Sequence, residues 1–313
     1  MSEKKLMKGN EAIAEAAIRG GCRYFFGYPI TPQNEIPEYM SWRIREVGGD
    51  FVQAESEVAA INMVYGAAGA GARAMTSSSS PGISLKQEGI SYIACAELPC
   101  VIVNMVRSGP GLGGILASQC DYFQTVKGGG HGDYKLLTYA PSTVQEAVDI
   151  LYYAFDKADE YRTPVCILGD GLLGQIMEPV TFPEMKEMPD PSTKSWAVTG
   201  THHGKDKTLA SSIYIDPNLG EAQNNHLVEK FERIAQKETQ CEEFMCDDAE
   251  IILTGYGSVG RIIKSAIYML REKGIKAGLV RPITLMPFPT KVYEKYAAKA
   301  SVKRFLTVEL SMG

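Results

Sequence analysis

The chain has 313 residues, of which 45% are hydrophobic and 22% are charged, and its formal net charge is −5. This length and composition are typical of about two globular domains. Because the charge balance is acidic and no polybasic stretch occurs, we expect neither nucleic acid nor an anionic membrane surface as a partner.

No segment of the sequence has the pattern of a signal peptide or a membrane-spanning helix. Residues 1–9 carry lysines without an apolar core, and the small-residue run 58–72 carries Asn62 and several glycines. The seven cysteines include no C-x-x-C pair, which is typical of reduced thiols in a cytoplasmic protein. An iron–sulfur cluster needs closely spaced thiolates, so we expect none in this chain.

Residues 1–180 alternate helical and strand patterns. Asn10 is expected to cap the first helix, and a Gly-Gly pair to end it. Alternation of this kind predicts an α/β fold with a mainly parallel sheet covered on both faces. The predicted helices are 11–19, 33–47 and 57–70, and the predicted strands are 23–27, 51–54, 74–77, 99–106 and 165–168.

Two further segments follow this domain. Residues 181–248 are rich in proline and charge and contain one polar amphipathic helix, 218–238, so they are predicted to be a linker. Residues 249–313 return to the α/β alternation and predict a second, smaller domain. Because the sequence ends at Gly313 directly after a predicted strand, we expect a covering helix to be missing there. The predicted strands of this domain are 250–254, 277–280 and 304–308, and the predicted helices are 258–273 and 290–298.

Ligands of such sheets bind beyond the carboxyl ends of the strands, so the loops at these ends are the candidate sites. The loop 27–32 (GYPITP) has two prolines that fix the backbone and present the Thr31 hydroxyl; a rigid turn is the alternative. The loop 53–57 (QAESE) places Glu55 and Glu57 before an apolar helix, where acids also serve as helix-start residues.

Two more strand-end loops carry polar groups. Residues 76–82 offer a row of hydroxyls before a helix, which fits a cradle for a polar ring or anion, or equally a solvated turn. Arg107 precedes the glycine-rich segment 108–114. Its guanidinium could pair bidentately with a substrate carboxylate, and a surface salt bridge is the comparable alternative.

Residues 255–260 (GYGSVG) satisfy the literal dinucleotide-binding pattern between a strand and a helix. The next strand ends in Val280-Arg281 where that pattern expects an acid, so NADP binding is a weak alternative and a tight turn is favoured. The four histidines lack metal-ligand spacing, and no metal site is expected. His131, in a glycine-rich loop of the first domain, is a candidate for proton transfer. His202 and His203 are expected to be exposed in the linker.

Taken together in this order, the loops 27–32, 53–57 and 77–82 resemble the pyrimidine-binding domain of 2-oxoacid:ferredoxin oxidoreductases, and the resemblance extends through 127–134 and 170–171. Residues 255–258 and 281–289 resemble the transketolase-type C-terminal domain of that family. Nearly the whole chain is covered. The chain is most similar to the α-type subunit of the branch that acts on 3-methyl-2-oxobutanoate (2-ketoisovalerate), although 2-oxoglutarate enzymes have near relatives of it.

The resemblance implies thiamine diphosphate as the cofactor and a role for each matching residue. Glu57 matches the glutamate that contacts the aminopyrimidine ring and activates the cofactor. Thr31 and Arg107 match positions near the carboxylate and oxo group of the substrate. The wall around the cofactor would include Tyr28, Pro29 and Ile30.

The chain is expected to hold half of an active site. Residues 169–171 (GDG) lack the downstream asparagine of a diphosphate and Mg²⁺ motif, so a thiamine-diphosphate-binding β-type subunit is expected to hold that end. The iron–sulfur clusters are expected on another partner subunit, with ferredoxin, coenzyme A and a 2-oxoacid as reactants. The remaining alternatives are a partner with a vestigial site and the E1 component of an NAD-linked oxoacid dehydrogenase complex.

Overall fold

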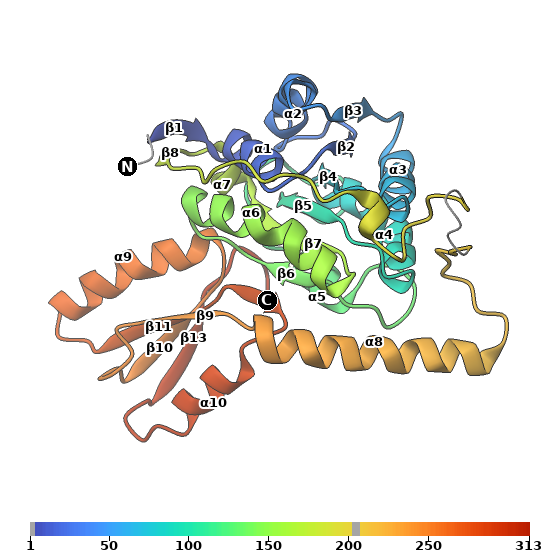
Figure 1. The fold of residues 1–313 in the computed structure, drawn as a ribbon. Helices are drawn as coiled ribbons and strands as arrows, with labels where there is room; N and C mark the ends of the chain where they lie inside the picture. Colours follow the sequence, from blue (N-terminus) through green and yellow to red (C-terminus); the bar gives the residue numbers. More distant parts are fainter. Residues whose placement is uncertain (1–3, 202–206) are drawn as a thin grey trace.

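The computed structural model describes residues 4–201 and 207–313 (Figure 1). His202 and His203, predicted to be exposed, lie outside these residues. The described chain forms a seven-stranded sheet of order β12-β6-β7-β5-β4-β2-β3, a four-stranded sheet of order β13-β10-β11-β9, and the pair β1-β8. This α/β architecture confirms the predicted fold class.

The seven-stranded sheet is parallel except at one edge, where β12 runs antiparallel to β6. Every residue of β5 and β7 is buried, as expected for parallel strands covered on both faces. The strands of this sheet are β2 (Tyr24–Gly27), β3 (Asp50–Gln53), β4 (Ala74–Ser78), β5 (Val101–Val106), β6 (Leu137–Tyr139), β7 (Val165–Asp170) and β12 (Thr284–Met286).

Two helical layers cover this sheet. Alternate side chains of β5 point to opposite faces, because Val101 and Val103 pack with α1, α2 and α6 whereas Ile102 packs with α3 and α4. The helices are α1 (Gly9–Arg19), α2 (Glu35–Glu46), α3 (Glu57–Gly69), α4 (Ser80–Cys95), α5 (Tyr122–Lys127), α6 (Val144–Tyr161) and α7 (Gly171–Gln175).

The predicted cap of the first helix is wrong. Asn10 lies inside α1, whose N-cap residue is Lys8 and has no side-chain cap hydrogen bond. The buried Asn10 amide instead donates to the Pro32 carbonyl at 2.8 Å and to Glu35 Oε2 at 2.7 Å. Asn10 therefore ties α1 to the loop that follows β2, and β1 (Lys5–Lys8) leads directly into the helix.

The predicted linker holds more structure than one helix. β8 (Met177–Val180) pairs with β1, and a short 3-10 helix, η1 (Pro191–Thr193), precedes α8 (Pro217–Glu238). Figure 1 shows α8 running along the outside of the molecule, and three of its residues are buried: Lys230, Ile234 and Glu238. β9 (Cys241–Phe244) then pairs with β11 in the four-stranded sheet, so the second sheet begins before residue 248.

The second domain is joined tightly to the first. Between its own elements the chain crosses back to add β12 to the first sheet. Within the described residues, no helix is long and apolar enough to cross a membrane. The other elements of this domain are β10 (Ile251–Thr254), α9 (Ser258–Glu272), β11 (Ala277–Pro282), α10 (Thr290–Ala297) and β13 (Arg304–Thr307). The division of the chain at residues 180 and 248 stays a prediction.

Candidate active site at the strand ends

The four predicted site loops follow β2, β3, β4 and β5, which are neighbouring parallel strands. Their carboxyl ends therefore meet at one edge of the sheet. Hydrogen bonds join the loops: Ser77 Oγ donates to Gln33 Oε1 at 2.5 Å, and the Arg107 guanidinium donates to the Thr31 carbonyl at 3.0 Å. The structure thus brings together the residues that the sequence predicted to share a site.

Glu57 is the first residue of α3, and 7% of its surface is exposed. Helix capping does not account for it, because the preceding Ser56 is the N-cap and its hydroxyl accepts from the Ala59 N–H at 3.1 Å. In the described part of the chain no side chain or N–H donates to the Glu57 carboxylate. A nearly buried carboxylate without a protein donor fits the protonated nitrogen of a ring held at this edge.

Space beside Glu57 is provided by Gly82 in the first turn of α4. A Cβ at this position would lie 2.8 Å from Glu57 Oε1 and 2.2 Å from Ser78 Oγ. Within residues 4–201 and 207–313, the buried hydroxyls of Ser78 and Ser79 have no hydrogen-bond partner. The hydroxyl row, the carboxylate and the glycine therefore form one polar cradle, which suits the polar edge of an aminopyrimidine.

Ser80 connects this cradle to Arg107. Its φ of 22° is a strained backbone conformation for a residue with a side chain. The strain is held by hydrogen bonds: Ser80 N–H donates to Asn104 Oδ1 at 3.2 Å, and Ser80 Oγ accepts from the Arg107 N–H at 3.0 Å. Strained residues held in this way concentrate at functional sites.

The Arg107 guanidinium is buried and already bonded to backbone. Its Nη1 donates to the Thr31 carbonyl and its Nη2 to the Leu112 carbonyl at 2.9 Å, whereas its Nε has no partner among the residues that the structure describes. Pairing with a substrate carboxylate would require one of these carbonyl contacts to be exchanged. Tyr28 and Pro29 are exposed at the same edge, so their predicted place in the cofactor wall stays a prediction.

Lys86 is a member of this site that the sequence reasoning missed. It is fully buried in α4, and its Nζ donates to Thr76 Oγ1 at 2.6 Å and to the Ser77 carbonyl at 3.3 Å. Burial lowers the pKa of Lys86 to about 7, while the nearby charge of Glu57 acts to raise it. The signal was available, because residue 86 occupies the apolar face of α4 at helical spacing from Gly82, Ile83 and Ile90.

The Asp170 side chain, in the segment 169–171, stabilises the fold through hydrogen bonds. Its Oδ1 accepts from the N–H groups of Leu172 and Leu173 at 2.9 and 3.0 Å, and its Oδ2 accepts from the Ser258 hydroxyl. Among the described residues, no group of three or more His, Cys, Asp or Glu side chains could hold a metal ion.

Packing and backbone conformation explain the glycines of the dinucleotide-like segment 255–260. A Cβ at Gly260 would lie 2.3 Å from Cδ of Arg281, and Gly257 has a φ of +57°. Arg281 is 3% exposed, and its guanidinium donates to Glu146 Oε1 at 2.7 Å and to Glu242 Oε2 at 2.6 Å. Because two carboxylates already hold this guanidinium, it is not available for a 2′-phosphate.

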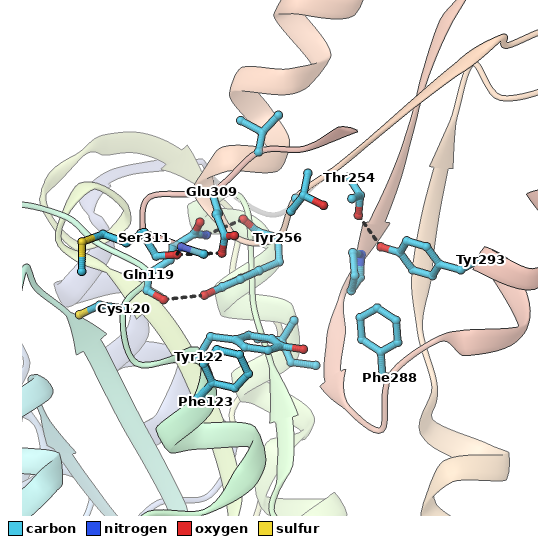
Figure 2. Close-up of a pocket in the computed structure, with 17 residues that line it drawn as sticks. Gln119, Cys120, Tyr122, Phe123, Thr254, Tyr256, Phe288, Tyr293, Glu309 and Ser311 are labelled. Atoms are coloured by element: carbon cyan, nitrogen blue, oxygen red, sulfur yellow. Dashed lines mark hydrogen bonds between the residues drawn. The ribbon is translucent and has the colours of Figure 1, made fainter. Parts of the chain in front are cut away.

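Two hollows are lined by the segment that follows β5 and by residues of the second domain. A cleft of about 650 Å³ lies beside the start of α4 and the loop 108–111. A second cavity, of about 420 Å³, lies between the two domains, and Figure 2 shows Tyr122 reaching it from the first domain and Phe288 and Tyr293 from the second. Glu57 lines neither of these two hollows.

Comparisons with known proteins place this fold and site in a class. Residues 15–242 match the family model described as pyruvate flavodoxin/ferredoxin oxidoreductase, thiamine diphosphate-binding, and residues 249–313 match pyruvate:ferredoxin oxidoreductase core domain II. The chain therefore belongs to the family of 2-oxoacid:ferredoxin oxidoreductase subunits. Its first domain is a thiamine-diphosphate-binding domain.

Among individual proteins, the chain is similar to subunits of two kinds of 2-oxoacid oxidoreductase. The chain is 51% identical over 309 residues to ketoisovalerate oxidoreductase subunit VorB of Methanothermobacter thermautotrophicus, covering 99% of this chain and 87% of the relative. It is 36% identical over 323 residues to 2-oxoglutarate synthase subunit KorA of Methanocaldococcus jannaschii, covering 95% of this chain and 87% of the relative.

A solved structure supports the same assignment. The 2-oxoglutarate:ferredoxin oxidoreductase of Magnetococcus marinus, with 2-oxoglutarate, coenzyme A and succinyl-CoA bound, superposes with a TM-score of 0.88 at 26% identity. The match covers 99% of this chain and 59% of that chain, so the present chain spans about three fifths of the solved one.

Proposed function

We propose that this chain is the α-type subunit of an oxidoreductase that decarboxylates branched-chain 2-oxoacids such as 2-ketoisovalerate, forms the acyl-CoA and reduces ferredoxin. The observation that carries the substrate class is the 51% identity to a ketoisovalerate oxidoreductase subunit, against 36% to a 2-oxoglutarate synthase subunit. The cytoplasm is the proposed location.

Glu57 is the proposed catalytic residue. Thiamine diphosphate, when bound, supplies the nucleophilic carbon and accepts the electrons that decarboxylation releases. The Glu57 carboxylate would accept a hydrogen bond from the far ring nitrogen of the aminopyrimidine and stabilise its protonated form. Support comes from its burial, from the absence of a protein donor within the described residues, and from the room that Gly82 leaves beside it.

Arg107 is proposed to bind the substrate carboxylate, with Thr31 beside it. A charge-assisted hydrogen bond of this kind contributes about 1.5–3 kcal/mol. Binding would replace a carbonyl contact of the guanidinium, and its unpartnered Nε–H supplies a further donor at that point. Tyr28, Pro29 and Ile30 are proposed to line the cofactor from the loop after β2.

The diphosphate and Mg²⁺ site and the iron–sulfur clusters are proposed to lie on partner subunits. The seven cysteines are free thiols, and in the described residues no acidic or thiolate cluster suits a metal. We assign the diphosphate and Mg²⁺ site to a β-type subunit and the iron–sulfur clusters to another. This assignment disfavours an NAD-linked E1 component, and copurification of iron–sulfur subunits distinguishes the two.

The test is a steady-state assay of the purified native complex with coenzyme A, a low-potential dye and a panel of 2-oxoacids. We expect kcat/KM for 2-ketoisovalerate to exceed that for 2-oxoglutarate by roughly 10–100-fold, because a second carboxylate left without a partner costs about 1–3 kcal/mol. A higher kcat/KM for 2-oxoglutarate would overturn the substrate assignment.

A further inference from the structure

Helix α4 begins without a cap from its own N-cap residue. Ser79 precedes the helix, but its side chain makes no cap hydrogen bond. The N–H of Ser80, the first residue of the helix, instead donates to Asn104 Oδ1 at 3.2 Å. Asn104 lies in β5 and is 1% exposed, so a neighbouring strand supplies the acceptor that this helix start needs.

Asn104 is the polar residue of an otherwise apolar strand. Every residue of β5 is buried, and its neighbours in that strand are valines, an isoleucine and a methionine. A buried amide in such a strand is costly unless both its oxygen and its nitrogen find partners. The two partners of Asn104 therefore show what this side chain is used for.

The second partner, Asp121, sets the orientation of the Asn104 amide. Asn104 Nδ2 donates to Asp121 Oδ2 at 2.9 Å in a buried hydrogen bond. An ionised carboxylate only accepts hydrogen bonds, so the amide turns its nitrogen to Asp121 and its oxygen to the Ser80 N–H. Asp121 is the N-cap residue of α5, yet its side chain makes no cap hydrogen bond there. Its carboxylate holds Asn104 and does not cap its own helix.

Ser80 in turn holds the backbone of Arg107. Its Oγ accepts from the Arg107 N–H at 3.0 Å and donates to the Arg107 carbonyl at 3.3 Å, so one hydroxyl bonds both backbone groups of that residue. The Ser80 φ of 22° is strained and persists only where neighbouring groups fix it. Asn104 bonds the N–H of this strained residue. Hydrogen bonds therefore run without a break from Asp121 through Asn104 and Ser80 to Arg107.

We propose that Asn104, oriented by Asp121, is a positioning residue that fixes the Arg107 backbone while the guanidinium binds the substrate carboxylate. This inference rests on the proposed role of Arg107. To accept a carboxylate, the guanidinium exchanges a carbonyl contact, and during that exchange its own contacts no longer hold the residue in place. The backbone bonds made by Ser80 do not depend on the guanidinium, and Asn104 keeps Ser80 in the conformation that makes them.

The test uses Asn104→Asp in the assembled complex with its preferred 2-oxoacid. This change sets a second carboxylate against Asp121 and removes the donor between the two residues. We expect KM to rise roughly 10-fold, as for the loss of a buried hydrogen bond, with C2 exchange of the cofactor retained in the absence of substrate. Adding Asp121→Asn to this variant again sets one donor against one acceptor, so KM should return to near the wild-type value.

The control is Tyr161→Phe, which also removes one buried hydrogen bond. The Tyr161 hydroxyl donates to Glu238 Oε1 at 2.6 Å, and α6 ends there, just before β7 begins at the opposite edge of the sheet from the site. This variant should melt at lower temperature with KM unchanged. Loss of stability alone therefore does not reproduce the effect expected for Asn104→Asp.

A second variant, Ser80→Ala, removes the hydroxyl that bonds the Arg107 backbone and introduces no charge. It should also raise KM, and it decides the question if Asn104→Asp folds poorly. A wild-type KM in either variant overturns the inference, and so does a double variant that stays as impaired as Asn104→Asp. An unchanged kcat/KM in Arg107→Ala contradicts the proposed function instead.

Discussion

Substitution of Gly82 by alanine tests whether the cradle around Glu57 is built as tightly as the structure indicates. The added Cβ would lie 2.2 Å from Ser78 Oγ, 2.8 Å from Glu57 Oε1 and 3.1 Å from Glu57 Cγ. Contacts this short force the Ser78 and Glu57 side chains to move. Overpacking of this kind costs about 1–3 kcal/mol of folding stability.

The larger effect should fall on turnover. Because a displacement of about 1 Å at a reacting group can reduce the rate about 10²-fold, we expect kcat of the Gly82→Ala complex to drop by roughly that factor. The matched control is Gly66→Ala, since Gly66 is exposed in α3 and its Cβ would meet no atom within 4 Å. Alanine there should raise stability by about 0.5–1 kcal/mol and leave kcat unchanged.

The assays are thermal melting of the chain and steady-state kinetics of the complex. If Gly82→Ala melts at lower temperature while kcat stays at the wild-type value, the Glu57 carboxylate is remote from the chemistry. Unchanged melting and unchanged kcat would show that the cradle has room that the structure does not give it.

Three further predictions concern the two domains and the partners. Arg107→Ala should lower kcat/KM for the 2-oxoacid by roughly 10–100-fold, with C2 exchange in the absence of substrate retained; loss of that exchange would place Arg107 at the cofactor instead. Arg281→Met should lower stability by about 1–3 kcal/mol in a melting experiment, since it leaves Glu146 without its cation while Glu242 keeps its ion pair with Lys264; no loss of stability would contradict this. The isolated chain should contain no iron and bind thiamine diphosphate weakly, and micromolar Mg²⁺-dependent binding by calorimetry would refute that prediction.

The sequence was most informative where the structure depends on local signals. Glycine and proline mark the ends of β2 and of α1, and period-2 and helical patterns predicted most elements of both domains to within a few residues. Parallel order then placed Thr31, Glu57 and Arg107 at one edge, because strand ends of a parallel sheet share a side.

Features that depend on distant contacts were missed. Asn10 has the residue type of a helix cap, but tertiary contacts with Pro32 and Glu35 use its amide. β9 and β12 are short strands whose partners lie elsewhere in the chain, so their pairing leaves no periodic pattern. α6 was also missing from the predicted helices, but its case is different. Its buried residues recur at helical spacing, so the sequence did contain the signal for this helix.

The assignment of Lys86 to the site depends on its burial, which only the structure shows directly. A single lysine in a helix is usually solvated, and only its helical spacing from Gly82, Ile83 and Ile90 indicates that Lys86 lies on the covered face of α4. The structure places the amine against β4, where it donates to the Thr76 hydroxyl and the Ser77 carbonyl.

The most direct test of the central claim is Glu57→Gln in the assembled complex, measured by hydrogen–deuterium exchange at the cofactor's C2 together with kcat and thermal melting. Glutamine keeps the size and reach of the side chain but removes its negative charge. We predict that C2 exchange and kcat fall by roughly 10²–10⁴-fold, as for a positioned acid or base, while the melting temperature stays nearly constant because Ser56 caps α3. Normal C2 exchange with a stability loss of about 0.3–1 kcal/mol would show instead that Glu57 is a helix-start residue.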